Sequence, residues 1–186
     1  LELNSRYADL YNTLAELSAR NRLYRRSVEF ARQAVSLDSL SWHGHGLLGM
    51  NLLRIGEIEE GRTSLETSFA LAPFDPWTKN TLDLLDTFSS YTSTQSKYFT
   101  LVMDRDEAPL LQLYLADIAD EAYDRLAERY GYRPDTPIRL EVYPRHADFS
   151  VRTVGMAGLG ALGVSFGNVL AMDSPSAREV GQFHWA

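Results

Sequence analysis

The fold is decided by the stretch from Trp42 to Pro73, which reads WHGHGLLGMNLLRIGEIEEGRTSLETSFALAP. When it is shifted by 34 residues, this stretch aligns with the residues that precede it in the sequence. The shift pairs Leu14 with Leu48, Ala15 with Gly49, Arg22 with Gly56, Ser27 with Gly61, Ala31 with Leu65, Ala34 with Ser68 and Leu37 with Leu71. The match indicates two tandem copies of one unit.

The glycines and the proline of this stretch predict a pair of packed helices. Gly49 and Gly61 let two antiparallel helices approach closely, because a side chain at the crossing would hold them apart. Gly56 can adopt a positive φ and end the first helix, and Pro73 cannot continue the second. The alternative is an ordinary helical hairpin that recurs by chance. We favour a true repeat, because a glycine-rich helix is a poor helix unless the glycines serve packing.

This pattern resembles the tetratricopeptide repeat, whose period is also 34 residues. The second copy has the small residues, the turn glycine and the final proline of that family in place. The first copy departs from it, with Arg22 at the turn and Ser39 where proline is expected. The resemblance implies an all-α repeat over residues 1–90, with copies at about 8–41 and 42–75. Residues 76–88, opened by Asp75-Pro76, are expected to form a capping helix.

Composition and charge narrow the functional classes. The chain has 186 residues, of which 45% are hydrophobic, and a net charge of −7. This negative charge argues against a nucleic-acid partner, and no apolar run is long enough to cross a bilayer. There is no cysteine, so disulfides and thiolate metal sites are excluded within this chain. The chain begins at Leu1 without methionine, so we expect a segment upstream, and the compartment stays open.

After a polar stretch, the pattern of hydrophobic residues in the second half of the chain differs from that of the first half. Residues 91–96 are rich in Ser and Thr and are expected to be a linker. Residues 97–186 are expected to form an α+β domain, with strands at 98–103, 137–143 and 164–172, a long helix at 106–130 and a short helix at 146–153. The long helix is expected to bury Leu110, Leu113, Tyr114, Ala116, Ile118, Ala122, Leu126 and Tyr130. The strand 137–143 alternates and is expected to be half-buried.

This order of elements resembles the first part of a gluzincin-type zinc peptidase domain, related to aminopeptidases. The matching segments are Tyr130-Gly131-Tyr132, Val142-Tyr143-Pro144 and Asp173-Ser174-Pro175. In such enzymes the next element is a helix with the motif His-Glu-x-x-His, whose histidines hold zinc and whose glutamate is the general base. No histidine of this chain is followed by glutamate: His43, His45, His146 and His184 all lack it. The resemblance therefore implies a domain truncated before that helix, with no catalytic or metal-ligating residue present. Zinc is expected only if the parent sequence continues into the motif.

Two features of the second half have a functional and a simpler interpretation. His146 stands beside Arg145 and Asp148 and is expected to be a solvated turn residue. The glycine-rich segment is a candidate for the edge strand that pairs with a peptide substrate, although plain turn geometry ranks first. The candidate strand consists of Gly158, Leu159, Gly160, Ala161 and Leu162.

The repeat predicts a groove for an extended or helical segment of a protein or peptide. By repeat position its candidate residues are Asn12, Glu16, Arg20, His43, Met50, Leu53, Arg54, Asn80 and Leu84. The alternative is that these positions only solvate the groove or contact the second domain. The sequence thus predicts an interaction scaffold attached to part of a zinc-peptidase-like domain, inactive as it stands. The other hypothesis is a pure interaction module with a non-catalytic α+β domain.

Overall fold

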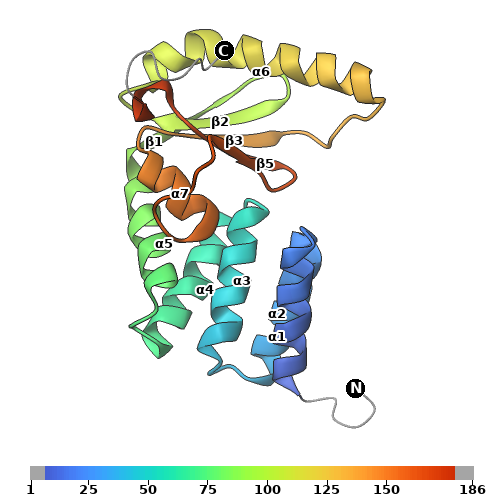
Figure 1. Ribbon diagram of the computed structural model, residues 1–186, viewed down its shortest axis with the longest axis vertical. Coiled ribbons are helices and arrows are strands. Elements are labelled where there is room, and N and C mark those ends of the chain that lie inside the picture. The colour runs from blue at the N-terminus through green and yellow to red at the C-terminus, as the bar shows by residue number, and fades with distance from the viewer. Residues whose placement is uncertain (1–6, 179–186) are drawn as a thin grey trace. The chain divides into compact units, whose positions relative to one another are not determined.

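The computed structural model describes residues 7–178, and its contacts divide the chain into two units between Asp83 and Leu84. The first unit is helical and the second is a mixed sheet with helices, so a helical region precedes an α+β domain. The helices of the first unit are α1 (Ala8–Arg20), α2 (Tyr24–Leu37), α3 (Trp42–Arg54), α4 (Ile58–Leu71) and the greater part of α5 (Pro76–Asp86) (Figure 1).

The helix boundaries of the first unit repeat every 34 residues. Helices α1 and α3 begin at residues 8 and 42 and end at residues 20 and 54. Helices α2 and α4 begin at residues 24 and 58 and end at residues 37 and 71, and α5 begins at residue 76. The turns match as well, because Arg22 and Gly56 both have a positive φ, of 60° and 90°. The structural period is therefore the one that the sequence predicts.

The close helix approach predicted at Gly49 and Gly61 is confirmed. A Cβ atom added at Gly49 would lie only 2.8 Å from the carbonyl oxygen of Gly61. In the first copy these positions are Ala15 and Ser27, and both are buried. The Ser27 hydroxyl donates a 2.8 Å hydrogen bond to the Ala15 carbonyl oxygen, so a side chain contact joins α1 and α2 there.

The second unit is built on a five-stranded sheet of order β1-β2-β3-β5-β4 (Figure 1). Strands β2 (Phe99–Asp104), β3 (Ile138–Tyr143) and β5 (Val169–Asp173) are parallel. The two edge strands, β1 (Tyr91–Gln95) and β4 (Gly163–Ser165), are antiparallel to their neighbours. The other elements are α6 (Ala108–Tyr130), α7 (His146–Val154) and the short 3₁₀ helices η1 (Thr87–Ser90) and η2 (Pro175–Ala177).

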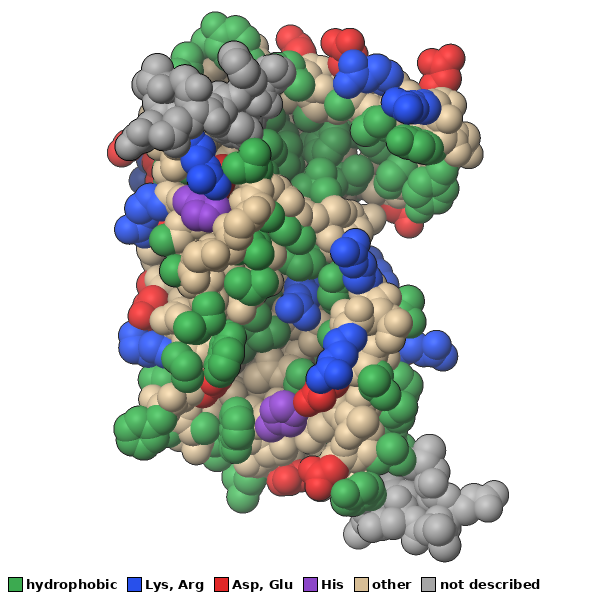
Figure 2. Space-filling view, viewed as in Figure 1, with side chains coloured by type: hydrophobic (Ala, Val, Ile, Leu, Met, Phe, Trp, Pro, Cys, Tyr) green, Lys and Arg blue, Asp and Glu red, His purple; other side chains and the backbone are tan. Residues whose placement is uncertain are grey.

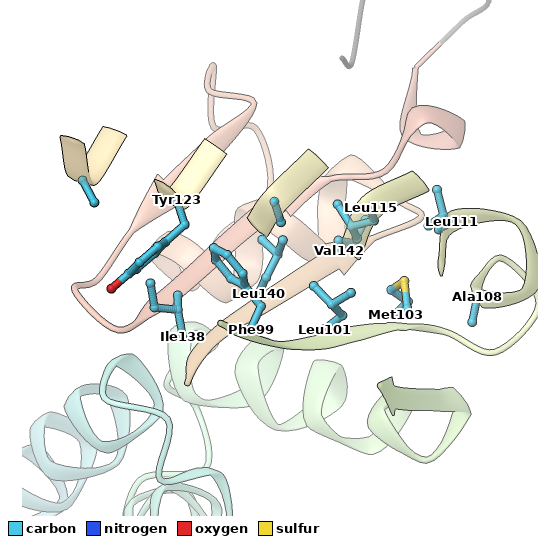
Figure 3. Close-up of a cluster of buried hydrophobic side chains, with 12 residues drawn as sticks. Phe99, Leu101, Met103, Ala108, Leu111, Leu115, Tyr123, Ile138, Leu140 and Val142 are labelled. Carbon is cyan, nitrogen blue, oxygen red and sulfur yellow. The ribbon is translucent and has the colours of Figure 1, made fainter. Parts of the chain in front are cut away.

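One face of the sheet packs against α6 and forms the core of this unit. Side chains of β2 and β3 point at the helix and are buried there, as Figure 3 shows for Leu101, Met103 and Leu140. The helix contributes every fourth residue to this contact, namely Leu111, Leu115, Ala119, Tyr123 and Ala127.

The buried face of α6 differs from the predicted one. Leu110, Leu113 and Tyr114 are 64%, 63% and 58% exposed, and Ile118, Leu126 and Tyr130 are exposed too. Hydrophobic residues surround almost the whole first half of this helix, so periodicity alone does not select the face. The face with Ala119 and Ala127 is the one that packs, because small side chains let the helix lie close to the sheet.

The opposite face of the sheet is covered by α7, so β3 is buried on both sides. The predicted half-buried strand is therefore wrong. Glu141 and Tyr143 point away from α6, yet they are 1% and 0% exposed. Parallel strands generally have both faces covered, and here α7 supplies the second cover.

The predicted linker at residues 91–96 is also wrong, because residues 91–95 form strand β1. Thr92 and Thr94 are β-branched and pair in register with Met103 and Leu101 of β2. A polar edge strand resembles a linker in the sequence, because the strand that it pairs with, here β2, lies in another part of the chain.

The single strand predicted at 164–172 is a hairpin of two short strands. The chain turns at Gly167, whose φ is +87°, a conformation that favours glycine. Residues 158–162, the candidate substrate strand, form a loop that leads into the edge strand β4.

Candidate functional site

Helices α1, α3 and α5 form a row in the first unit, and side chains connect each helix to the next. On α3, the ring nitrogen Nε2 of His43 lies 2.8 Å from Oε1 of Glu16 on α1. One end of α3 reaches α5, where the Thr81 hydroxyl oxygen lies 3.7 Å from the sulfur of Met50 and donates its proton to the Trp77 carbonyl oxygen at 2.8 Å. Glu16 also attracts Arg20 one turn later, at 3.8 Å. The row thus carries a partly exposed polar surface.

Six of the nine predicted groove residues are accessible on these three helices. They are Glu16, Arg20, His43, Met50, Arg54 and Asn80. Arg54 is held in place, since it donates to Asn51 at 3.1 Å and lies over the Tyr24 ring at 5.4 Å.

The remaining three are buried and offer little surface to a partner. Asn12, Leu53 and Leu84 are 5%, 1% and 4% exposed. Leu53 packs at the glycine contact of α3 and α4, where a Cβ atom at Gly61 would lie 2.8 Å from its Cδ2. Repeat position alone assigned Leu53 to the groove, although it belongs to the core. The two faces of α3 are next to each other, so one residue along the helix separates a groove position from a core position.

A network of charged side chains is buried between β3 and α7. The Arg152 guanidinium donates from Nε to Oε2 of Glu141 at 2.7 Å, and Arg139 donates to Oε1 at 2.6 Å. The Tyr143 hydroxyl donates to Oε2 at 2.8 Å. Burial alone would raise the pKa of Glu141, but the charges of the two arginines and their hydrogen bonds outweigh it and lower that pKa.

This network is a polar core with no free group for chemistry. Burial, together with the Glu141 charge, raises the pKa of the Tyr143 hydroxyl well above its ordinary value. The hydroxyl therefore stays protonated and donates. Arg152 is 1% exposed in its side chain, so a substrate in solution does not reach the ion pair. We assign the network a structural role, which fixes α7 on the sheet.

His146 lies at the carboxyl end of β3 and joins the glycine-rich loop to β5. Its Nδ1 is 2.9 Å from Oδ2 of Asp173, and its Nε2 is 2.7 Å from the Leu159 carbonyl oxygen. Arg178 also donates to Asp173 at 3.1 Å and approaches the His146 Nδ1 atom at 3.1 Å. His146, predicted to be a solvated turn residue, is thus partly buried, with 26% of its side chain exposed, and it connects the glycine-rich loop to β5.

These residues do not fit a catalytic zinc site. Both ring nitrogens of His146 are already engaged, and Arg178 places a positive charge beside them. Within residues 7–178 no three His, Cys, Asp or Glu side chains are grouped so that they could hold a metal ion. His184 lies outside the described residues.

An apolar groove of about 520 Å³ runs beside α6 in the second unit. We call it the α6 groove: its wall includes Ile118, Ala122, Leu126 and Tyr130 of α6, and its floor includes Leu170 and Met172 of β5. Figure 2 shows a hollow below α6 that is lined with hydrophobic side chains. Four of these residues belong to the stripe that the sequence predicts to be buried, so that stripe marks an open apolar surface.

No protein-family model, curated protein or solved structure matches the chain. In the part that the structure describes, no helix has the length and apolarity needed to cross a membrane.

Proposed function

We propose that the first unit is a tetratricopeptide-like repeat that binds a protein or peptide segment across α1, α3 and α5. The observation that carries this proposal is the row of three helices joined through Glu16, His43 and Met50. A segment laid across the row meets a carboxylate, an imidazole and a thioether that are all partly exposed. The 34-residue period of the helix boundaries supports the same proposal.

The binding surface has a mixed character that suits a peptide. Glu16 can accept hydrogen bonds from a partner, and Asn80 can both donate and accept. Met50 supplies a flexible apolar contact that adapts to different side chains. We therefore expect moderate affinity for peptides that combine a basic or amide donor with an apolar residue.

Selection of peptides from a displayed random library on residues 1–186 tests the proposal. We expect the selected peptides to lose at least about tenfold in affinity when Glu16→Lys and Met50→Glu are combined. The control is Glu66→Lys on α4, where Glu66 pairs with the neighbouring Arg62 at 2.8 Å on the surface. If no peptide is selected, or if both variants bind alike, the repeat does not bind across this row.

A second candidate function is that of the N-terminal part of a zinc-peptidase-like domain. The order β2, α6, β3, α7, β4, β5 supports it, because this is the strand and helix order on which the resemblance to gluzincins rests. The resemblance places the zinc ligands on a His-Glu-x-x-His helix, which would belong to a longer chain.

Metal analysis of residues 1–186 beside a longer natural chain tests this second candidate. We expect zinc at one equivalent only in the longer chain. Its absence from the longer chain would favour the alternative, an interaction module with a non-catalytic α+β domain.

A further inference from the structure

The cover that α6 gives to its face of the sheet stops between β3 and β5. On β2 and β3 the residues facing the helix are buried, with Leu101 at 0% and Leu140 at 5% exposure. On β5 the corresponding residues, Leu170 and Met172, are only partly buried. They form the floor of the α6 groove. The uncovered part of this face is therefore apolar and continuous with the core.

The width of this uncovered part matches one helix. Neighbouring strands lie about 4.8 Å apart, so β5 and β4 together span about 10 Å. A helix with its side chains is about 10 Å across. On α6 the groove extends from Leu115 to Tyr130, a length of about 22 Å at 1.5 Å per residue. A partner helix of about 16 residues would fill it.

A helix suits this surface better than an extended segment or a small molecule. An extended segment would lay unpaired backbone groups on an apolar floor, whereas a helix bonds its own backbone. A small ligand is normally oriented by a few converging polar groups. The groove offers few, and the Tyr123 hydroxyl already donates to the Pro134 carbonyl oxygen at 2.8 Å.

Two arginines of α6 flank the wall of the groove. Arg125 and Arg129 lie one turn apart on α6, next to the wall residues Leu126 and Tyr130. The Arg129 guanidinium is 5.6 Å from the centre of the Tyr130 ring. Among residues 7–178 neither arginine has an ion-pair partner, although the whole chain has a net charge of −7. Glu121 and Glu128 lie farther round the helix, toward its outer side.

We propose that the α6 groove binds an amphipathic helix of a partner polypeptide. Its apolar face covers Leu170 and Met172 of β5, and its acidic flank pairs with Arg125 and Arg129. This proposal concerns only the second unit and does not rest on peptide binding by the first.

Two labelled helical peptides of about 16 residues, with one shared apolar face, test the proposal. One carries Glu along its flank and the other carries Lys. Fluorescence anisotropy is measured with the chain at concentrations where sedimentation velocity shows a single monomeric species. We expect the Glu peptide to bind at least about tenfold more tightly than the Lys peptide. The double variant Arg125→Glu, Arg129→Glu should reverse this preference.

Matched variants on the same helix distinguish binding in the groove from non-specific hydrophobic binding elsewhere on the surface. Leu126→Asp should weaken the Glu peptide by more than about tenfold, and Leu110→Asp should leave it unchanged. Both positions are exposed, at 46% and 64%, so both variants should melt like the wild type. Equal binding of the two peptides, no binding of either, or equal loss in both variants would overturn the proposal. A concentration-dependent dimer that Leu126→Asp abolishes, without peptide binding, would make a second copy the occupant instead.

Discussion

Gly46 and Gly49 lie one turn apart on α3, yet a methyl group added at the two positions meets different surroundings. At Gly49 it would lie 2.6 Å from Leu65 Cγ and 2.8 Å from the Gly61 carbonyl oxygen. At Gly46 it would meet only the Ser68 hydroxyl, at 3.2 Å. We expect Gly49→Ala to lower the free energy of unfolding by about 1–3 kcal/mol through overpacking.

The control is Gly46→Ala, which should destabilise less than Gly49→Ala, because the added methyl group requires only the Ser68 hydroxyl to shift by a few tenths of an ångström and alanine is the better helix former. Urea unfolding of both variants measures the difference. A Gly49→Ala variant as stable as Gly46→Ala would contradict the close helix approach.

Glu141 predicts how stability depends on pH. Its folded pKa lies below the ordinary value of 4.5, because Arg152 and Arg139 outweigh the effect of burial. The carboxylate therefore contributes its full stability above about pH 4.5 and loses it as the pH falls through the folded pKa. Glu141→Gln should lower the free energy of unfolding at pH 7 by about 3–5 kcal/mol, since the buried Arg152 loses its charged partner.

The same variant should flatten the loss of stability between about pH 5 and pH 3. Chemical unfolding across this range measures it. The control is Glu66→Gln, an exposed pair that should change stability by less than about 0.5 kcal/mol. An unchanged pH profile in Glu141→Gln would mean that Glu141 is not the residue that responds.

At the scale of elements, the two helical pairs have different residues at the equivalent position of their turns. Arg22 and Gly56 occupy equivalent positions with φ of 60° and 90°. A positive φ is strained for every residue except glycine, by roughly 1–2 kcal/mol. Arg22→Gly should therefore raise the melting temperature of the first unit, and Gly56→Ala should lower it. Calorimetry on both variants checks the opposite signs. Two shifts of the same sign would show that the two turns are not equivalent.

At the scale of the whole molecule, contacts cluster within two units, and the chain passes from the first to the second between Asp83 and Leu84. We expect each destabilising substitution to act mainly within its own unit. Gly49→Ala should speed amide hydrogen exchange in α1 to α4, and Glu141→Gln should speed it in β2, β3 and α7. Mass spectrometry of exchanged peptides measures both patterns in one experiment. Uniform acceleration along the chain in both variants would indicate a single cooperative unit.

The sequence by itself determined the helical pairs and, in the second unit, the order β2, α6, β3 and α7, because their signals are local. Gly56, Pro73 and Pro76 end or begin helices through their own backbone preferences, whatever lies around them. Part of the candidate surface was predictable for the same reason: the 34-residue shift places Glu16, His43 and Met50 on the first helix of each pair. The predicted binding role of these residues stays a prediction.

Only the tertiary structure decided which faces are buried. The sequence places hydrophobic residues around most of the first half of α6, and the sheet selects the side with Ala119 and Ala127. The remaining stripe, with Ile118 and Leu126, becomes the wall of a groove. Glu141 looks like the outer residue of a half-buried strand until α7 brings Arg152 onto it. In each case the deciding neighbour belongs to another element, and local periodicity contains no information about which element will cover which side.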